Sequence, residues 1–262
     1  MAQGAAARAA IQVATTGLPI DRREEAVIAE SAREHAFALL RAAPSALLAR
    51  VRGAVDDRPR LLALLETDLL GVSAGRWLGI RDEAGLLEWA TETTAPLARD
   101  YLIRLSLTEP RGPAMTSDPA AKPSDDESGA YSRQWQRPLV AAMRSRPLLQ
   151  HWLARLIETV LYATDDAETP CGELYATAVG PGNAHSIIST ARGLLRHEVV
   201  IEDGIVRDYS IVAPTDVHFA ANGPAHRWLA GAASASAAQS RQFAEQVVAA
   251  LDPCVDYRIT SL

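Results

Sequence analysis

The chain has little cysteine and no long apolar run. It holds 2 cysteines in 262 residues, so no disulfide framework supports the fold, and a reducing cytoplasm is the expected location. The longest uninterrupted apolar stretches, such as 61–65 and 247–251, are far shorter than the roughly 20 residues that cross a bilayer. The Ala-rich start carries Arg8 and lacks a basic region followed by an apolar stretch. We therefore expect neither a secretory signal nor a membrane span.

Positive charge is also scarce. There are 26 Lys and Arg residues against 32 Asp and Glu residues, which gives a net charge of −6. A nucleic-acid binder needs a basic surface to neutralise phosphates, so this class of partner is disfavoured. Hydrophobic residues make up 48% of the chain and charged residues 22%, which is typical of a globular domain with a sizeable core.

The chain is rich in Ala and Leu, both strong helix formers, which favours a mainly helical body. Asp21 and Glu24 have the spacing of a capping box and predict a helix that stops at Pro44. Further helices are predicted near 60–70 and from an N-cap at Asp82, the second interrupted by Pro96. A longer helix is predicted over about 138–164, because apolar residues recur there on one stripe: Leu149, Leu153, Leu156 and Val160.

The segment 108–134 interrupts this helical pattern. It contains several prolines together with Asp, Ser and Lys, and its first 25 or so residues hold almost no large apolar side chain. Such a segment cannot order itself through burial, so a flexible loop is predicted. The helical body is accordingly expected over 1–107 and 135–165.

After Pro170 the pattern changes to strands. Two β-branched stretches, 194–202 and 205–212, flank Asp203-Gly204, and this dipeptide favours a type I′ turn with positive φ at both central residues. A last amphipathic helix is predicted around 244–251. The expected fold is mainly α, a helical bundle with a small subdomain formed by a β-hairpin or small sheet, in a single domain spanning 1–262. Its part 170–262 carries the hairpin, the last helix and a cysteine tail.

Three segments of this last part, taken together, resemble the C-terminal portion of the large subunit of nickel-iron hydrogenases. The segment 191–197 resembles the family's Pro-Arg-Gly segment and the strand after it, and 213–219 is similar to its Pro-Thr-x-Trp-Asn-Phe. Asp252-Pro253-Cys254 matches the first half of its Asp-Pro-Cys-x-x-Cys signature. The segment 30–35 resembles the HupK/HoxV branch, which consists of maturation proteins. The resemblance implies a reduced form of the large-subunit fold.

Departures from the enzyme pattern imply that this chain is not an enzyme. Tyr257 stands where the family has its second cysteine, Thr260 stands where it has a histidine, and the N-terminal Arg-x-Cys-Gly-x-Cys motif is absent. Three of the four cysteine positions that hold nickel and iron are therefore missing, so no catalytic residues and no nickel are expected. The segment 2–10 resembles the helix that follows the N-terminal motif, which predicts that the chain begins late, through a wrong start assignment or real loss.

The resemblance implies a site for the Fe(CN)2CO unit, held transiently. Cys254 is the expected metal ligand, since a soft thiolate suits such an iron. Arg192 and Thr215 are expected to donate to the cyanide nitrogens from one end of the sheet, with Pro214 fixing the backbone. An apolar wall around the carbonyl is predicted from Leu194, Val212 and Phe219.

Structural alternatives stay open for each of these residues. Cys254 is equally consistent with a small buried hydrophobe, Arg192 with a solvated residue before a strand, and Thr215 with a turn cap. Cys171 has no family counterpart and is predicted to be a structural or exposed thiol rather than a second iron ligand. Four histidines lack metal-binding spacing and are interpreted as surface or hydrogen-bonded residues: His185, His197, His218 and His226.

The function implied by the resemblance is that of a non-catalytic maturation factor. It would hold or relay the iron unit, with hydrogenase maturation chaperones and the hydrogenase large subunit as partners. The alternative is a cofactor-free mimic of the large subunit that serves as an interaction module for those chaperones.

Overall fold

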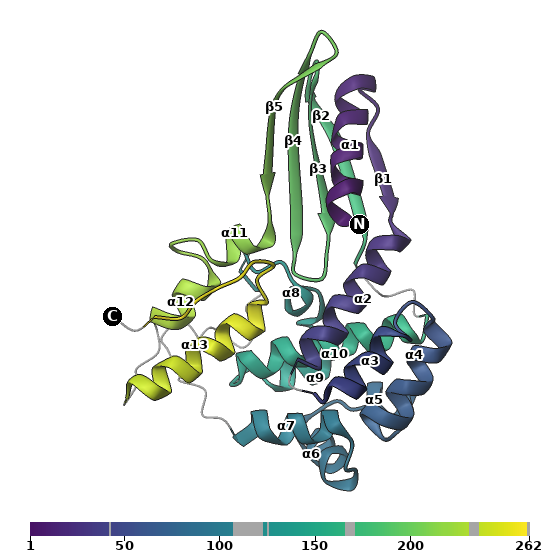
Figure 1. Cartoon of the computed structure of the whole chain (residues 1–262), viewed down its shortest axis with the longest axis vertical. Coiled ribbons are helices and arrows are strands. Elements are labelled where there is room, and N and C mark those ends of the chain that lie inside the picture. The colour runs from purple at the N-terminus through teal and green to yellow at the C-terminus, as the bar shows by residue number, and fades with distance from the viewer. Residues whose placement is uncertain (42, 107–122, 125, 166–170, 231–235, 261–262) are drawn as a thin grey trace.

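The computed structural model describes residues 1–41, 43–106, 123–124, 126–165, 171–230 and 236–260. A body of helices lies at one end, and a long antiparallel sheet projects from it with α1 (Ala2–Thr16) along one face (Figure 1). The sheet has the order β1-β2-β3-β4-β5, in sequence order. Its strands are Ile20–Arg23, Glu173–Gly180, Asn183–Ser189, Leu194–Glu202 and Ile205–Val212.

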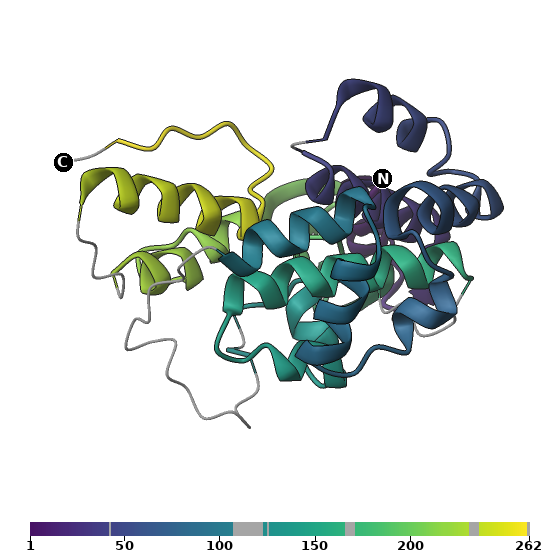
Figure 2. The same ribbon diagram turned by 90° about the horizontal axis from the view of Figure 1, so that it is seen from below.

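The helical body is built from the elements between β1 and β2. In chain order they are α2 (Glu25–Leu39), α3 (Ser45–Arg52), α4 (Arg58–Leu64), the π-helix η1 (Leu65–Leu70), α5 (Ala74–Leu78), α6 (Glu83–Glu92), α7 (Pro96–Ser106), α8 (Ala130–Gln134), α9 (Pro138–Ala142) and α10 (Pro147–Ala163). Three further helices follow the sheet: α11 (Pro214–His218), α12 (Pro224–Ala230) and α13 (Ala237–Leu251). Seen from below, α12 and α13 lie on the opposite side of this body from α3 and α4 (Figure 2).

Helix α10 lies at the centre of the body. Every residue from Leu148 to Ala163 is buried, which is the pattern of a helix enclosed on all sides. It packs against α2, α8 and α13. The predicted helix over 138–164 is divided here into α9 and α10, because Pro147 lacks a backbone N–H and its ring cannot continue a helix from the preceding turn.

Of two helix starts predicted from capping residues, one is confirmed and the other is wrong. Asp82 caps α6 by accepting the Gly85 N–H at 2.9 Å, as predicted. The capping box at Asp21 and Glu24 is wrong: Asp21 pairs with Tyr175 in the sheet, and Glu24 makes no side-chain cap bond. The spacing of Asp21 and Glu24 fits a capping box, but the pairing of β1 with β2 places Asp21 in a strand instead. The helix predicted near 60–70 is observed as α4 followed by η1.

The hairpin between β4 and β5 is confirmed. Glu202 pairs with Ile205 across the turn, and Asp203 and Gly204 have φ values of 52° and 75°. The β part is larger than the predicted hairpin, however, because β1, β2 and β3 complete a sheet of five strands. Alanines of α1 pack on one face of β2, β3 and β4, where their small side chains allow a close approach. The mainly α class is confirmed, but the small subdomain is a full sheet layer.

The flexible loop predicted over 108–134 lies mostly outside the described residues. Its described end is more ordered than predicted, because α8 begins at Ala130 and Glu127 is buried. Asp126 also forms an ion pair with Arg227 of α12, at 2.7 Å.

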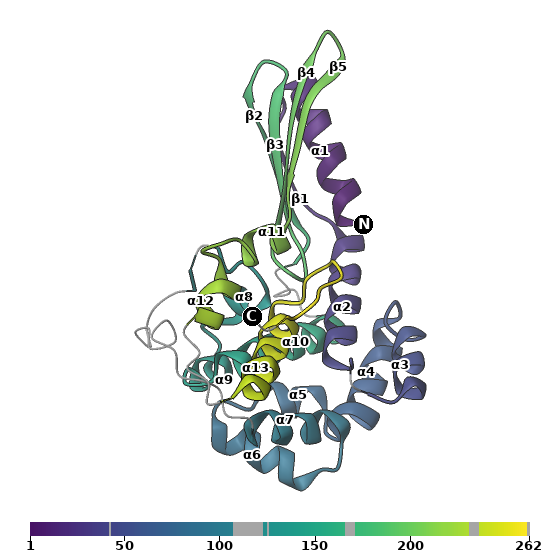
Figure 3. The ribbon, with the colours of Figure 1, turned by 60° about the vertical axis from the view of Figure 1, so that its left-hand side comes forward.

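The C-terminal helix is confirmed. α13 ends at Leu251, and Asp252 follows with the left-handed φ of 50°. The described residues after α13 then pass below the junction of β5 and α11 (Figure 3). None of the described helices is both long enough and apolar enough to cross a bilayer.

Candidate functional site

The sheet topology places three of the predicted site residues at one end. Arg192 precedes β4, and Pro214 and Thr215 follow β5 as the first residues of α11. Since β4 and β5 are antiparallel, the start of one strand lies beside the end of the other, and Arg196 pairs with Val212 there. α13 brings Cys254 to the same place from the helical body.

Thr215 and Cys254 are in direct contact. The Thr215 hydroxyl donates to Cys254 Sγ at 3.3 Å, and the Cys254 N–H donates to Thr215 Oγ1 at 3.3 Å. A hydroxyl has one proton and two lone pairs, so both bonds can form at once. Thr215 therefore holds the backbone of Cys254 and orients its sulfur.

Arg192 holds the chain two residues before that sulfur. Its Nε donates to the Asp252 carbonyl at 2.7 Å, and its Nη2 pairs with Asp252 Oδ2 at 3.1 Å and with Glu34 Oε2 at 2.6 Å. Burial by itself would lower the pKa of Arg192, but Asp252, Glu34 and Cys254 outweigh it, and the pKa is raised. The guanidinium remains charged beside the Cys254 segment.

A glycine permits the close packing of these segments. Gly193 has φ +145°, and a Cβ at this position would lie 2.5 Å from Ser128 Oγ and 3.3 Å from Pro214 Cβ. Ser128 also accepts the Leu194 N–H at 3.0 Å. The Arg-Gly dipeptide thus lets the start of β4 approach Pro214, which is buried.

The predicted apolar wall does not enclose this site. Leu194, Val212 and Phe219 are 46%, 40% and 37% exposed. β5 is an edge strand with every residue exposed, so the described chain places nothing over it. Cys254 is itself exposed, and Val255 and Tyr257 beside it are exposed as well. The thiol is exposed beside the Thr215 hydroxyl, where a soft metal or another protein can reach it.

A second cluster, which the sequence reading missed, surrounds Glu158 of α10. Both of its oxygens bind Arg133, at 2.8 Å each, and Oε2 also meets His35 Nε2 at 2.8 Å. The Cys171 thiol donates to the same oxygen at 3.6 Å. Glu158 is 1% exposed. The cluster ties α2, α8 and the start of β2 to the central helix.

This buried cluster contains residue types that bind metals, but the Arg133 guanidinium already occupies the Glu158 carboxylate. His35, Glu158 and Cys171 offer ligand atoms within 4.8 Å of one another. Burial would raise the pKa of Glu158, yet Arg133 and His35 reverse this and lower it, so the carboxylate is ionised and neutralised by a guanidinium. Burial also raises the pKa of Cys171 to about 12, which keeps it a thiol. The cluster is a structural junction, and Cys171 is buried.

The histidines are less uniform than predicted. His218 is 3% exposed, and neither ring nitrogen has a partner among the described residues. Burial lowers its pKa to about 4. His197 is also buried and contacts the Tyr209 hydroxyl at 2.5 Å. The interpretation of His218 as a surface or hydrogen-bonded residue is therefore wrong, because its ring is enclosed on the side of the helical body, in a small pocket that His151 and Arg155 also line.

Comparisons with known proteins agree with the sequence resemblance. The chain is 30% identical over 241 residues to the hydrogenase expression/formation protein HoxV of Cupriavidus necator, covering 78% of this chain and 63% of that protein. It is 32% identical over 118 residues to the hydrogenase expression/formation protein HupK of Azotobacter vinelandii, covering 45% of this chain and 34% of HupK. This chain is a homologue of HoxV and HupK. It spans less than two thirds of the length of either relative.

Other comparisons add little. No protein-family model matches the chain. One solved structure, an NAD+-reducing [NiFe]-hydrogenase in the H2-reduced state, aligns with 49% of this chain and 34% of its own, at 21% identity and a TM-score of 0.32. A likeness of this size does not establish a shared fold, so the large-subunit-like fold remains a prediction.

Proposed function

We propose that this homologue of HoxV and HupK is a non-catalytic maturation factor that holds or relays the Fe(CN)2CO unit during assembly of a nickel-iron hydrogenase large subunit. The observation that carries the proposal is the contact of Thr215 with Cys254, beside Arg192 bound to Asp252. These are the residues that the hydrogenase resemblance selects, and they come from three separate parts of the chain.

The chemistry of the site suits a transferable iron unit as cargo. Cys254 supplies one soft sulfur ligand, and the Thr215 hydroxyl and the charged Arg192 supply donors for cyanide nitrogens. A single exposed thiol fills one coordination position only. The remaining ligands therefore come from the protein that delivers the unit or the one that receives it, and transfer is an exchange of one thiolate for another on iron. Nickel, which the enzyme binds with further thiolates, is not expected.

The partners in this proposal are hydrogenase maturation chaperones and the hydrogenase large subunit. A reducing cytoplasm is the proposed location, because Cys254 must stay reduced to bind iron. Exposed apolar residues at this end of the sheet also support the second candidate, a cofactor-free mimic of the large subunit that docks on the chaperones. Leu194, Val212 and Phe219 offer the kind of exposed apolar surface that marks protein contacts.

Infrared spectra distinguish the two candidates. The protein is purified anaerobically from cells that express the maturation machinery, as the full chain and as Cys254→Ser and Cys171→Ser variants. The iron carrier predicts cyanide and carbonyl bands in the parent and in Cys171→Ser, and their loss in Cys254→Ser. If the parent shows no bands, or the bands persist in Cys254→Ser, the carrier is ruled out. Co-purification of chaperones without bands would then favour the mimic. Hydrogen-dependent dye reduction is expected to be absent from all three.

A further inference from the structure

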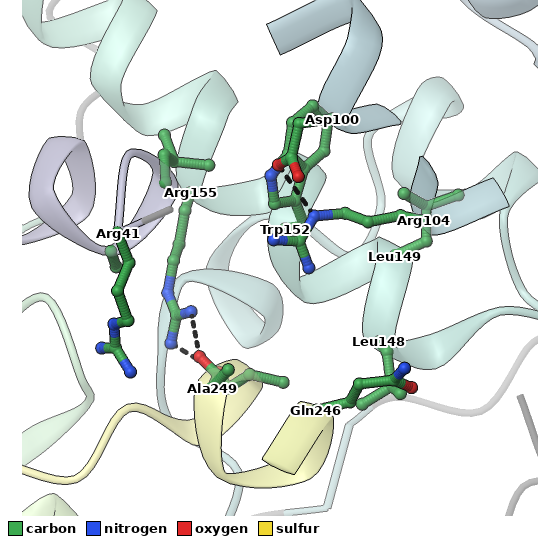
Figure 4. Close-up of a pocket in the computed structure, with 12 residues that line it drawn as sticks. Arg41, Asp100, Arg104, Leu148, Leu149, Trp152, Arg155, Gln246 and Ala249 are labelled. Atoms are coloured by element: carbon green, nitrogen blue, oxygen red, sulfur yellow. Dashed lines mark hydrogen bonds and ion pairs between the residues drawn. The ribbon is translucent and has the colours of Figure 1, made fainter. Parts of the chain in front are cut away.

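A cavity of about 270 Å³ lies between α2, α7, α10 and α13, apart from the Cys254 surface. We name it the four-helix cavity. Its lining combines apolar residues with three arginines, Arg41, Arg104 and Arg155, and one aspartate, Asp100 (Figure 4). Pockets for small organic ligands range from roughly 300 to 1,000 Å³ and are mostly apolar with a few placed polar groups. The four-helix cavity, at about 270 Å³, lies just below this range and suits a ligand of few atoms.

The polar part of the lining carries an excess of positive charge. Arg104 pairs with Asp100 at 2.9 Å. Arg41 pairs with Asp252, which also forms an ion pair with Arg192. Arg155 has no carboxylate partner within hydrogen-bond distance among the described residues. It donates to the carbonyls of Ala249 and Ala250 at the end of α13. Burial lowers the pKa of Arg155 to about 10; Asp252 acts in the opposite direction, while the neighbouring cations Arg192, Arg41 and Arg104 also lower it.

The guanidinium groups also have donors to spare. Each carries five N–H groups, whereas the described hydrogen bonds and ion pairs use one on Arg41, one on Arg104 and two on Arg155. The Gln246 side chain, on the same wall, has no hydrogen bond in the part of the chain that the structure describes. Unused donors on three cationic side chains match the acceptor oxygens of a carboxylate, which arginine binds in a planar, two-bond geometry.

The rest of the lining is apolar and lies to one side. Figure 4 shows Arg41 and Arg155 extending towards the end of α13, with Leu148 and Leu149 on the opposite side of the cavity. Trp152 lies between, with the Arg104 guanidinium 5.7 Å from its ring centroid. A ligand that fits this arrangement has one anionic end and one apolar end.

We propose that the four-helix cavity binds a small organic carboxylate, with its charged end at Arg41, Arg104 and Arg155 and its apolar body against Leu148, Leu149 and Trp152. The lining of the cavity includes none of Cys254, Thr215, Pro214 and Arg192, although Arg41 and Arg192 both pair with Asp252. The proposal does not rest on the iron proposal, because binding of a carboxylate is measured without iron, and either can fail without the other.

The test uses benzoate as a probe, titrated calorimetrically into the full-length protein in a buffer free of carboxylates. Benzyl alcohol is the uncharged analogue and sulfate is the inorganic anion. Benzoate is expected to bind at least roughly tenfold more tightly than either. No heat from benzoate up to about 10 mM would overturn the proposal, as would equal binding of benzyl alcohol or of sulfate.

Two variants locate the binding. Ala38→Phe fills the cavity from α2, and Arg104→Gln removes a cation from α7; each is expected to weaken benzoate binding at least roughly tenfold. Matched controls are Ala26→Phe and Arg99→Gln, exposed positions on the same two helices, which are expected to bind as the parent does. Circular dichroism confirms that each variant is folded. Unchanged binding in both folded cavity variants would show that benzoate binds elsewhere and overturn the proposal.

Discussion

Thr215 and Cys254 are 39 residues apart in the sequence, and each donates one hydrogen bond to the other at 3.3 Å. One residue begins α11 after the sheet, and the other follows the last helix. The pair therefore joins the sheet end to the helical body through a single hydroxyl. The exposed thiol is presented by two structural units, and its position depends on both.

Only one of the two thiols is expected to react in the folded protein. Cys254 is exposed, whereas Cys171 is 1% exposed and burial raises its pKa to about 12. Iodoacetamide at neutral pH should add one group per chain, located at Cys254 by peptide mass spectrometry, and a second group only after unfolding in urea. Modification of Cys171 under native conditions would contradict the burial described here.

The Thr215 hydroxyl is expected to protect the Cys254 amide from exchange. Thr215→Val removes the acceptor of that N–H, and a hydrogen bond of this kind contributes about 0.5–1.5 kcal/mol net. Amide hydrogen exchange at Cys254 should therefore be roughly two- to tenfold faster, as measured by NMR. Thr215→Ser keeps the hydroxyl and should exchange as the parent does. Equal rates in parent and Thr215→Val would show that the contact does not hold the tail.

The sequence predicts well where local chemistry decides the structure. The Asp203-Gly204 turn, the Asp82 cap and the end of α13 at Asp252 are each specified by residues within a few positions. β1 is different, because its four residues form a strand only by pairing with β2, whose residues lie 150 or more positions later. Pro147 divides the predicted helix over 138–164, and here the decisive signal is local, because a proline inside a helical pattern breaks the helix.

For the candidate site too, contacts between residues far apart in the sequence were not predictable from local patterns. The resemblance selected Arg192, Thr215 and Cys254, and the structure brings them to one end of the sheet. The exposure of Leu194 and Val212 was not predictable, since it depends on what covers the edge of the sheet rather than on the strand itself. The Glu158 cluster joins His35 to a residue 123 positions away, and no local spacing signals that contact.

Glu158 is expected to be a large contributor to stability. Glu158→Gln leaves the Arg133 guanidinium, on a side chain only 10% exposed, without its charge partner, and breaking such an ion pair costs about 3–5 kcal/mol. Urea unfolding at pH 7 should show this loss, while Glu88→Gln, at an exposed position of α6, should change the free energy of unfolding by less than about 0.5 kcal/mol.

The same carboxylate predicts the direction of the pH dependence. The folded pKa of Glu158 lies below its ordinary 4.5, so its contribution is complete above that value and is lost as the pH falls below it. The stability of Glu158→Gln should accordingly depend less on pH in this acidic range. If the variant and the parent lose stability in parallel, the carboxylate does not carry this effect.

The lowered pKa of His218 predicts a second pH dependence of stability, in a higher pH range than that of Glu158. Its folded pKa of about 4 lies below the ordinary 6.5, so between these values the unfolded chain binds a proton that the folded chain does not. The free energy of unfolding should therefore be fully retained above pH 6.5 and fall by about 3 kcal/mol from this group as the pH drops to 4.

Replacement of His218 by an apolar residue removes this pH dependence and leaves no polar group behind, since neither ring nitrogen has a described partner. His218→Leu should thus be close to the parent in stability at pH 7 and more stable than it at pH 4.5, as measured by urea unfolding. The exposed His226 provides the control: His226→Leu should follow the parent at both pH values, and a His218→Leu curve that does the same would refute the assignment.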